Sequence, residues 1–483
     1  MIFNSIDFAI FLPIVFILFW VFTKTVKERN ILIVLSSYLF YGWWDWRFLS
    51  LILFSTVLDY SIGIGLSKQT VPKKRLVLIW ISVFVNLGFL GFFKYFNFFL
   101  DSFVTAFSFF GTEINSPTLN IILPIGISFY TFQTLSYTID IYRKDIEANR
   151  NFIAFAAYVC FFPQLVAGPI ERPGNLLPQF LKQKKLKFIN FQFGIIRILW
   201  GLFKKVVIAD RLSVMVNEVY NSPENYGGIH YLIATVLFAF QIYCDFSGYS
   251  DIAIGTARMF DFKLMENFKT PYFSSSLTEF WRRWHISLST WFRDYIYIPL
   301  GGNKVSKSRI YFNIFIIFLI SGFWHGAKWT FIIWGVLHGL FMVLDAITKN
   351  RFLFFSKENK LVYWLKILSV FLLTSFAWIF FRANTTKDAF LIVSNLLDFS
   401  QPLVTNIRGQ QLYMDLPFWK LLVNFSLIVF LLTVEYLIRF NKLKESTIIQ
   451  KKIVYRWSLY LALILCILIF GSFEISQFIY FQF

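Results

Sequence analysis

Cysteine is scarce in this sequence. The 483 residues include three, Cys160, Cys244 and Cys466, which stand far apart in apolar segments. None has the paired spacing of a metal site, and no disulfide framework is visible. The pattern favours three small side chains buried among apolar neighbours.

Charged residues are also few. They make up 15% of the chain, against 57% hydrophobic residues, whereas soluble domains carry about 25% charged residues. The apolar residues form unbroken runs, and residues 77–93 and 458–473 contain no charge. Because about 20 apolar helical residues span the ~30 Å hydrocarbon core of a bilayer, the sequence predicts an all-α integral membrane protein with many crossings.

The basic residues indicate the orientation of these crossings. They outnumber the acidic residues by 46 to 27, which gives a net charge of +19. We assign this excess to cytoplasmic loops and to contact with membrane lipid, not to nucleic acid, because Lys and Arg accumulate on the cytoplasmic side. Applied loop by loop, the rule predicts about 12 transmembrane helices with both termini outside. Residues 1–483 are expected to form a single membrane-embedded domain.

Two apolar segments need separate interpretation. Residues 6–22 are expected to be the first transmembrane helix and not a cleaved signal peptide, since no basic residue precedes them. Residues 152–170 have basic residues on both sides and contain Pro163, Gly168 and Pro169. We expect a re-entrant segment there, enclosed by protein or by a water-filled cavity. Further crossings are expected near residues 188–209, 229–257, 310–322, 329–347, 361–381, 421–438 and 457–473.

Histidine is rare, yet its distribution is uneven. Three of the four histidines fall between residues 285 and 338, where an even distribution would place fewer than one. Histidine suits proton transfer near neutral pH, and polar groups inside a bilayer are candidates for function. His325 lies between two apolar segments with Gly322 and Gly326 beside it, and glycine permits close approach of a backbone or a ligand. The alternative is a histidine in a hydrogen bond between helices.

The other two histidines of this group are less clear. His338 would point about 140° away from His325 on one continuous helix, and packing between helices is the favoured interpretation. His285 follows Glu279 and Arg283, which would form an i, i+4 pair on a helix. Its segment is either an anchor at the membrane interface or the cytoplasmic mouth of a site, with Arg282 and Arg283 available to phosphates.

Asp245 and Asp251 add two carboxylates to an otherwise apolar segment. Their spacing aligns poorly on a helix, so we expect them to be partners of Arg or His on neighbouring helices and not a shared acid/base pair. The sequence contains no glycine-rich phosphate loop, metal-ligand motif or nucleophile elbow.

These residues fall in motifs that resemble the membrane-bound O-acyltransferase family, in its alginate O-acetylation type. The matching motifs are FNSIDF at residues 3–8, PQLVAGPI at 163–170, DFSGYSD at 245–251, WRRWH at 281–285, RDYIYIPLGGN at 293–303 and WHG at 324–326. The resemblance covers most of the chain and is weakest after about residue 386. The YIPLGGN ending is similar to the branch that acetylates polysaccharides.

The resemblance implies a ring of transmembrane helices around a central tunnel. His325 would be the principal catalytic histidine, and His285 the second, near the cytoplasmic entrance. The expected substrate contacts are Trp281, Arg282, Arg283, Arg293 and Trp324. No metal and no bound cofactor are expected.

The resemblance also implies a reaction. An acetyl thioester, acetyl-CoA, would bind at the cytoplasmic face of the inner membrane, and His325 would act as general base or transient acyl carrier. A separate extracytoplasmic acetyltransferase would then acetylate an exported polysaccharide. Two alternatives stay open: D-alanyl transfer to teichoic acid from a carrier protein, and a polysaccharide or lipid transporter, which should show paired broken helices in two related halves.

Overall fold

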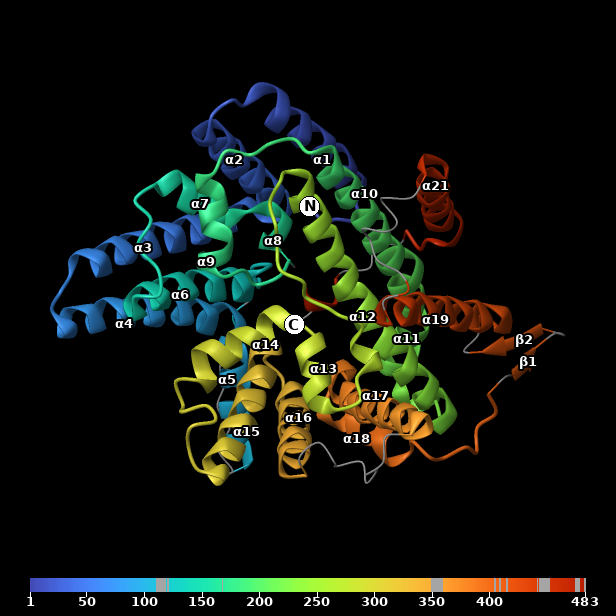
Figure 1. The fold of residues 1–483 in the computed structure, drawn as a ribbon. Coiled ribbons are helices and arrows are strands. Elements are labelled where there is room, and N and C mark those ends of the chain that lie inside the picture. The colour runs from blue at the N-terminus through green and yellow to red at the C-terminus, as the bar shows by residue number, and fades with distance from the viewer. Residues whose placement is uncertain are drawn as a thin grey trace. The chain divides into compact units, whose positions relative to one another are not determined.

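The computed structural model describes residues 1–109, 119, 121–166, 168–348, 359–403, 405–407, 410–413, 416–440, 442, 452–473 and 478–481. Contacts divide the chain into two compact units. The N-terminal unit comprises Met1–Ile195 and Ala253–Met265, and the C-terminal unit comprises Ile196–Ile252 and Glu266–Phe483. Figure 1 shows that helices make up most of each unit.

The N-terminal unit consists of α-helices and short 3-10 or π-helical elements (η). They are α1 (Ile6–Ile17), η1 (Leu18–Phe22), α2 (Val26–Asp45), η2 (Trp46–Phe48), α3 (Leu49–Lys68), α4 (Pro72–Leu90), η3 (Gly91–Tyr95), α5 (Phe96–Phe109), α6 (Ile127–Arg143), α7 (Phe152–Cys160), α8 (Phe162–Leu165), α9 (Pro173–Leu176) and η4 (Leu177–Leu181). α10 (Phe188–Leu202) and α12 (Gly228–Met259) contribute residues to both units.

The C-terminal unit contains the histidine-rich segment. Its elements are η5 (Phe203–Ala209), α11 (Asp210–Asn221), η6 (Pro223–Asn225), η7 (Pro271–Phe273), α13 (Leu277–Arg283), α14 (Ile286–Phe292), η8 (Arg293–Tyr297), α15 (Lys307–His325), α16 (Trp329–Ile347), α17 (Lys360–Arg382), α18 (Thr386–Ser394), β1 (Thr405–Ile407), β2 (Gln410–Tyr413), β3 (Leu416–Pro417), α19 (Phe418–Arg439), α21 (Ile453–Phe470) and η9 (Ile479–Phe481).

The predicted all-α polytopic membrane fold is confirmed. Within the described residues, eight helical segments are long and apolar enough to cross a membrane. They are Val26–Lys68, Pro72–Ser108, Gly228–Met259, Lys307–His325, Trp329–Ile347, Lys360–Arg382, Phe418–Arg439 and Ile453–Phe470. Ile6–Phe22 is a shorter apolar helix. The count of about 12 crossings, the central tunnel and the single domain stay predictions.

Two segments differ from regular membrane helices. Within its described residues, the predicted re-entrant segment contains α7 and α8, which are separated at Phe161 and are each too short to span a bilayer. The three-stranded antiparallel sheet β1-β2-β3 was not predicted, and its register pairs Thr405 with Leu412 and Leu412 with Pro417.

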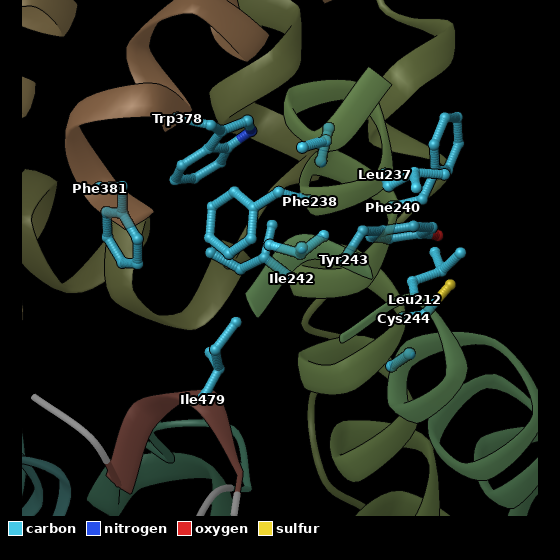
Figure 2. Close-up of a cluster of buried hydrophobic side chains, with 14 of the residues drawn as sticks. Leu212, Leu237, Phe238, Phe240, Ile242, Tyr243, Cys244, Trp378, Phe381 and Ile479 are labelled. Carbon is cyan, nitrogen blue, oxygen red and sulfur yellow. The ribbon is translucent and has the colours of Figure 1, made fainter. Parts of the chain in front are cut away.

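The core of the C-terminal unit gathers around α12. Figure 2 shows Phe238 and Ile242 of α12 in one buried cluster with Trp378 and Phe381 of α17. Ile479 of η9 belongs to the same cluster. Cys244 also lies in this core and Cys160 is buried in the N-terminal unit, and all three cysteines are free thiols.

α15 and α16 cross at two glycines. A Cβ atom on Gly322 would lie 2.4 Å from the Phe331 carbonyl oxygen, and one on Gly335 would lie 2.5 Å from the Phe318 carbonyl oxygen. Such close contact between backbones is typical of small residues at membrane helix interfaces. The crossing places the end of α15, and with it His325, against α16.

We therefore expect Gly335→Ala to destabilise the protein by about 1–3 kcal/mol, because the added methyl group meets backbone that cannot turn away. The midpoint of thermal unfolding in detergent measures the effect. Gly88→Ala in α4 is the matched control, since nothing lies within 4 Å of the added Cβ atom there. Equal midpoints for the two variants would contradict a tight crossing of α15 and α16.

Candidate functional site

His325 is the last residue of α15 and is buried, with 4% of its surface exposed. Aromatic rings from four parts of the chain surround its imidazole. The ring centroids lie 4.9 Å away for Trp324, 5.0 Å for Trp334, 5.2 Å for Phe381 and 5.6 Å for Tyr480. Aromatic side chains therefore enclose the His325 imidazole, and little of it is accessible to water.

His285 lies in the turn between α13 and α14 and is 1% exposed. Its φ of +43° is in the left-handed region, which a residue with a side chain rarely adopts. The centroid of its ring lies 4.6 Å from that of Phe246, 6.2 Å from Trp324 and 6.3 Å from Tyr480. Such burial does not fit the alternative of an anchor at the membrane interface.

Trp324 and Tyr480 therefore contact both histidines. The structure brings His285, Trp324 and His325 together within the C-terminal unit, from two of the motifs singled out in the sequence. These three residues and Tyr480 are called the pocket below. Trp281 lies further along the same aromatic cluster, with its ring centroid 5.8 Å from Trp334.

Tyr480 was not among the predicted site residues. Its hydroxyl is buried and has no hydrogen-bond partner within the described part of the chain. The Ile479 backbone N–H donates to Asp245 Oδ2 at 2.8 Å, which holds η9 against α12. In the sequence Tyr480 is one more aromatic residue in an apolar stretch, and only the long-range contact with Asp245 reveals its place.

The buried carboxylates of α12 are paired with cationic side chains, where the sequence predicted arginine or histidine partners. Lys205 of η5 lies 2.7 Å from Asp245 Oδ1 and 2.8 Å from Asp210 Oδ1. Lys204 lies 2.5 Å from Asp251 Oδ2, and Arg197 lies 2.7 Å from Asp251 Oδ1. The partners are lysine and arginine, and no contact of these carboxylates with histidine is among the described interactions.

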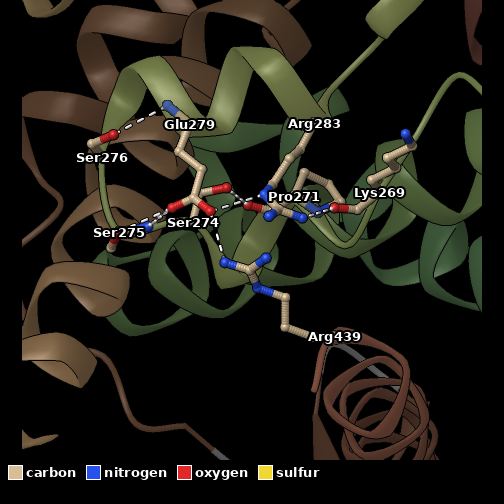
Figure 3. Close-up of polar contacts among 8 residues, drawn as sticks. All are labelled: Lys269, Pro271, Ser274, Ser275, Ser276, Glu279, Arg283 and Arg439. Carbon is tan, nitrogen blue, oxygen red and sulfur yellow. Dashed lines mark hydrogen bonds and ion pairs between the residues drawn. The ribbon is translucent and has the colours of Figure 1, made fainter. Parts of the chain in front are cut away.

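The predicted phosphate-binding arginines occupy different surroundings. Figure 3 shows Arg283 beside Glu279, with Arg439 of α19 bound to the same carboxylate. Arg283 also donates to the Lys269 carbonyl oxygen at 3.0 Å, so it holds the local fold together. Arg282 is exposed, and Arg293 is exposed and paired with Asp294 at 2.7 Å. Among the interactions of the described residues, these three arginines have no common partner.

His338 packs among aromatic side chains. Its ring centroid lies 4.8 Å from Trp334 and 5.0 Å from Trp281, and it is fully buried. Neither of its nitrogen atoms has a hydrogen-bond partner among the described residues. These contacts agree with the packing interpretation.

Comparison with known proteins identifies the family. The sequence profile of the membrane-bound O-acyltransferase family matches residues 143–383, which include both pocket histidines. A probable alginate O-acetylase of Azotobacter vinelandii is 41% identical over 415 residues, 85% of this chain and 81% of the relative. The chain belongs to the membrane-bound O-acyltransferase family. It is therefore a multi-pass membrane enzyme that transfers acyl groups.

Two other relatives of this membrane-bound O-acyltransferase have names that give different acyl groups and acceptors. A peptidoglycan O-acetyltransferase of Helicobacter pylori is 36% identical over 420 residues, 80% of this chain and 78% of the relative. A teichoic acid D-alanyltransferase of Streptococcus thermophilus is 30% identical over 328 residues, 62% of this chain and 76% of the relative. The O-acetylating relatives match more of the chain, at higher identity.

Tyr480→Phe tests the tyrosine that contacts both histidines. We expect it to lower acyl transfer by about 10- to 100-fold, because it removes the buried hydroxyl of a ring that contacts both histidines. Stability should change little, because the ring and its packing stay. Product formation per mole of folded enzyme measures the effect. The same substitution at Tyr231, whose hydroxyl donates to the Pro223 carbonyl oxygen at 2.6 Å, serves as the control. Unchanged transfer by Tyr480→Phe would leave the tyrosine with a packing role.

Proposed function

We propose that this acyltransferase takes an acetyl group from a cytoplasmic thioester, acetyl-CoA, and delivers it across the membrane for O-acetylation of an exported or cell-surface polysaccharide. The observation that carries the proposal is the pocket itself, in which His285 and His325 both contact Trp324 and Tyr480. Two imidazoles in a closed aromatic pocket suit acyl transfer, because water that would hydrolyse a reactive acyl group is excluded.

His325 has two possible roles in this reaction. As a transient acyl carrier, its nitrogen attacks the thioester carbonyl and the carbon–sulfur bond breaks with release of the thiol. As a general base, it takes the proton of the attacking hydroxyl. Both roles need an imidazole inside the membrane, where an acetyl group can pass while the large anionic donor stays behind.

The donor side is the less defined part of the site. Arg282 and Arg293 are exposed, and guanidinium groups suit phosphate binding. We propose that these two arginines, and not Arg283, contact the phosphates of the donor, because Arg283 is held by Glu279 and the Lys269 carbonyl. Trp281 and Trp324 would line the path of the acyl group.

The names of the relatives support the acceptor. The alginate and peptidoglycan O-acetylating relatives are 41% and 36% identical, against 30% for the D-alanyltransferase. We therefore prefer acetyl transfer to a polysaccharide over D-alanyl transfer. An extracytoplasmic acetyltransferase would complete the reaction, and the cytoplasmic (inner) membrane of the cell is the proposed location.

Purified protein in proteoliposomes tests the choice of donor. Radiolabelled acetyl-CoA is added in one set, and D-alanyl carrier protein in the other. We expect thiol release and label transfer only with acetyl-CoA. Release only from the D-alanyl carrier protein would replace acetyl transfer by D-alanyl transfer.

A further inference from the structure

The turn that carries His285 is built around Asn267. The backbone carbonyl oxygen of Asn267 accepts from the Ile286 N–H at 2.9 Å. Its side-chain oxygen Oδ1 accepts from the Ser287 N–H at 3.2 Å and from the Ser287 hydroxyl at 2.9 Å. One buried asparagine therefore holds the two backbone N–H groups that follow the left-handed residue His285.

These bonds also fix which way the Asn267 amide points. A backbone N–H can only donate, so the atom that faces Ser287 must be the oxygen. The amide nitrogen then faces the other way and donates to the Ser250 hydroxyl at 3.2 Å. With the amide reversed, two donors would face each other at Ser287.

The orientation of the amide decides the tautomer of His285. His285 Nδ1 lies 3.1 Å from Asn267 Oδ1, which is an acceptor. Nδ1 must therefore carry the proton, since in a neutral imidazole one nitrogen donates and the other accepts. Burial lowers the pKa of His285, which keeps its ring neutral. Nε2 is then the nitrogen that carries the lone pair.

We propose that Asn267 is a positioning residue that holds His285 as the Nδ1–H tautomer, so that Nε2 accepts the proton of the hydroxyl that receives the acyl group. This inference rests on the proposed function, and it assigns the general base to His285 and the acyl carrier to His325. The thiol has left by the time that the acyl group is bound to His325. When the hydroxyl oxygen attacks the carbonyl of that acyl group, a carbon–oxygen bond forms and the carbon–nitrogen bond to His325 breaks. The proton passes from the hydroxyl to His285 Nε2 and then to the His325 nitrogen that is released.

The four histidines of the chain make the tautomer measurable. Protein labelled with ¹⁵N-histidine gives few imidazole signals, and those of His285 are identified by their loss in His285→Gln. We expect a protonated Nδ1 and an unprotonated Nε2 in the parent protein. A proton on Nε2 of the parent would overturn the proposal without any activity measurement.

Three variants connect the tautomer to transfer. Asn267→Leu removes the acceptor, and we expect a mixed or reversed tautomer and a roughly 100-fold lower kcat with little change in KM. Asn267→Asp keeps an oxygen toward Nδ1 and is expected to retain the tautomer and recover at least about 10-fold of the loss. Ser250→Ala removes only the partner of the amide nitrogen and is expected to behave like the parent.

The outcomes separate the two proposals. Retention of the tautomer and of kcat in Asn267→Leu would overturn the role of Asn267. If Asn267→Leu does not fold, a reversed tautomer in Asn267→Asp would overturn it instead. An Nδ1–H tautomer in a parent protein that releases no thiol from acetyl-CoA would support the positioning role of Asn267 and refute the proposed donor.

Discussion

Replacement of His325 by glutamine is expected to lower acetyl transfer by about 100- to 10,000-fold, the range that general acid–base groups contribute. The loss follows from either role of His325, because an amide neither takes up a proton nor carries an acyl group. Glutamine keeps much of the volume of the side chain among Trp324, Trp334 and Phe381, so the pocket should stay folded. O-acetyl groups on the exported polysaccharide, measured at equal membrane levels of both proteins, report the effect.

His230→Gln in α12 is the matched control for this experiment, since it makes the same exchange at a buried histidine that has no place in the proposed reaction. Its acetylation should equal that of the parent. If His325→Gln acetylates normally at equal abundance, His325 has no part in the chemistry and the role of base or carrier passes to His285.

Lys205→Met is expected to prevent folding of most of the protein. Lys205 is 1% exposed and lies between Asp210 and Asp245, so its removal leaves two buried carboxylates without their cation. Breaking a buried pair in this way costs about 3–5 kcal/mol, a large part of a total stability of about 5–15 kcal/mol. The yield of monodisperse protein in detergent and its thermal midpoint measure the effect.

Lys187→Met provides the comparison at an exposed site. Lys187 is 55% exposed and lies 3.5 Å from Asp261, and such exposed pairs contribute about 0–1 kcal/mol. Its yield should equal that of the parent. A Lys205→Met protein with parental yield and midpoint would show that Asp210 and Asp245 need no cation. Asp245 would then hold the Ile479 N–H without help from Lys205.

The membrane helices were predictable because a long apolar run is a local feature, which neighbouring residues in the sequence reveal by themselves. The expected crossing at residues 329–347 coincides with α16, and the i, i+4 pair of Glu279 and Arg283 forms as expected. The strands β1 to β3 were missed, because they are two to four residues long and lie in a polar interval. Uneven histidine spacing located two of the pocket residues before any contact was known.

Other parts of the site could not be read from the sequence. Tyr480 reaches the pocket through a contact with Asp245, more than 200 positions away, and no local pattern encodes such a pairing. Asn267 acts through the left-handed turn at His285, which is a backbone conformation and not a motif. Arg283 was expected to bind phosphates because its charge was visible in the sequence. Its hydrogen bond to the Lys269 carbonyl oxygen, and the position of Arg439 on the same Glu279 carboxylate, were not visible there.

The glycine crossing of α15 and α16 also determines how the pocket can admit a substrate. Backbones in contact at Gly322 and Gly335 leave no room for the two helices to slide, so His325 and Trp334 move together. His285, in contrast, stands between two helices of seven residues each, and Tyr480 is carried by a three-residue element. We therefore expect an acyl group to enter between the histidines through movement of the His285 turn or of η9.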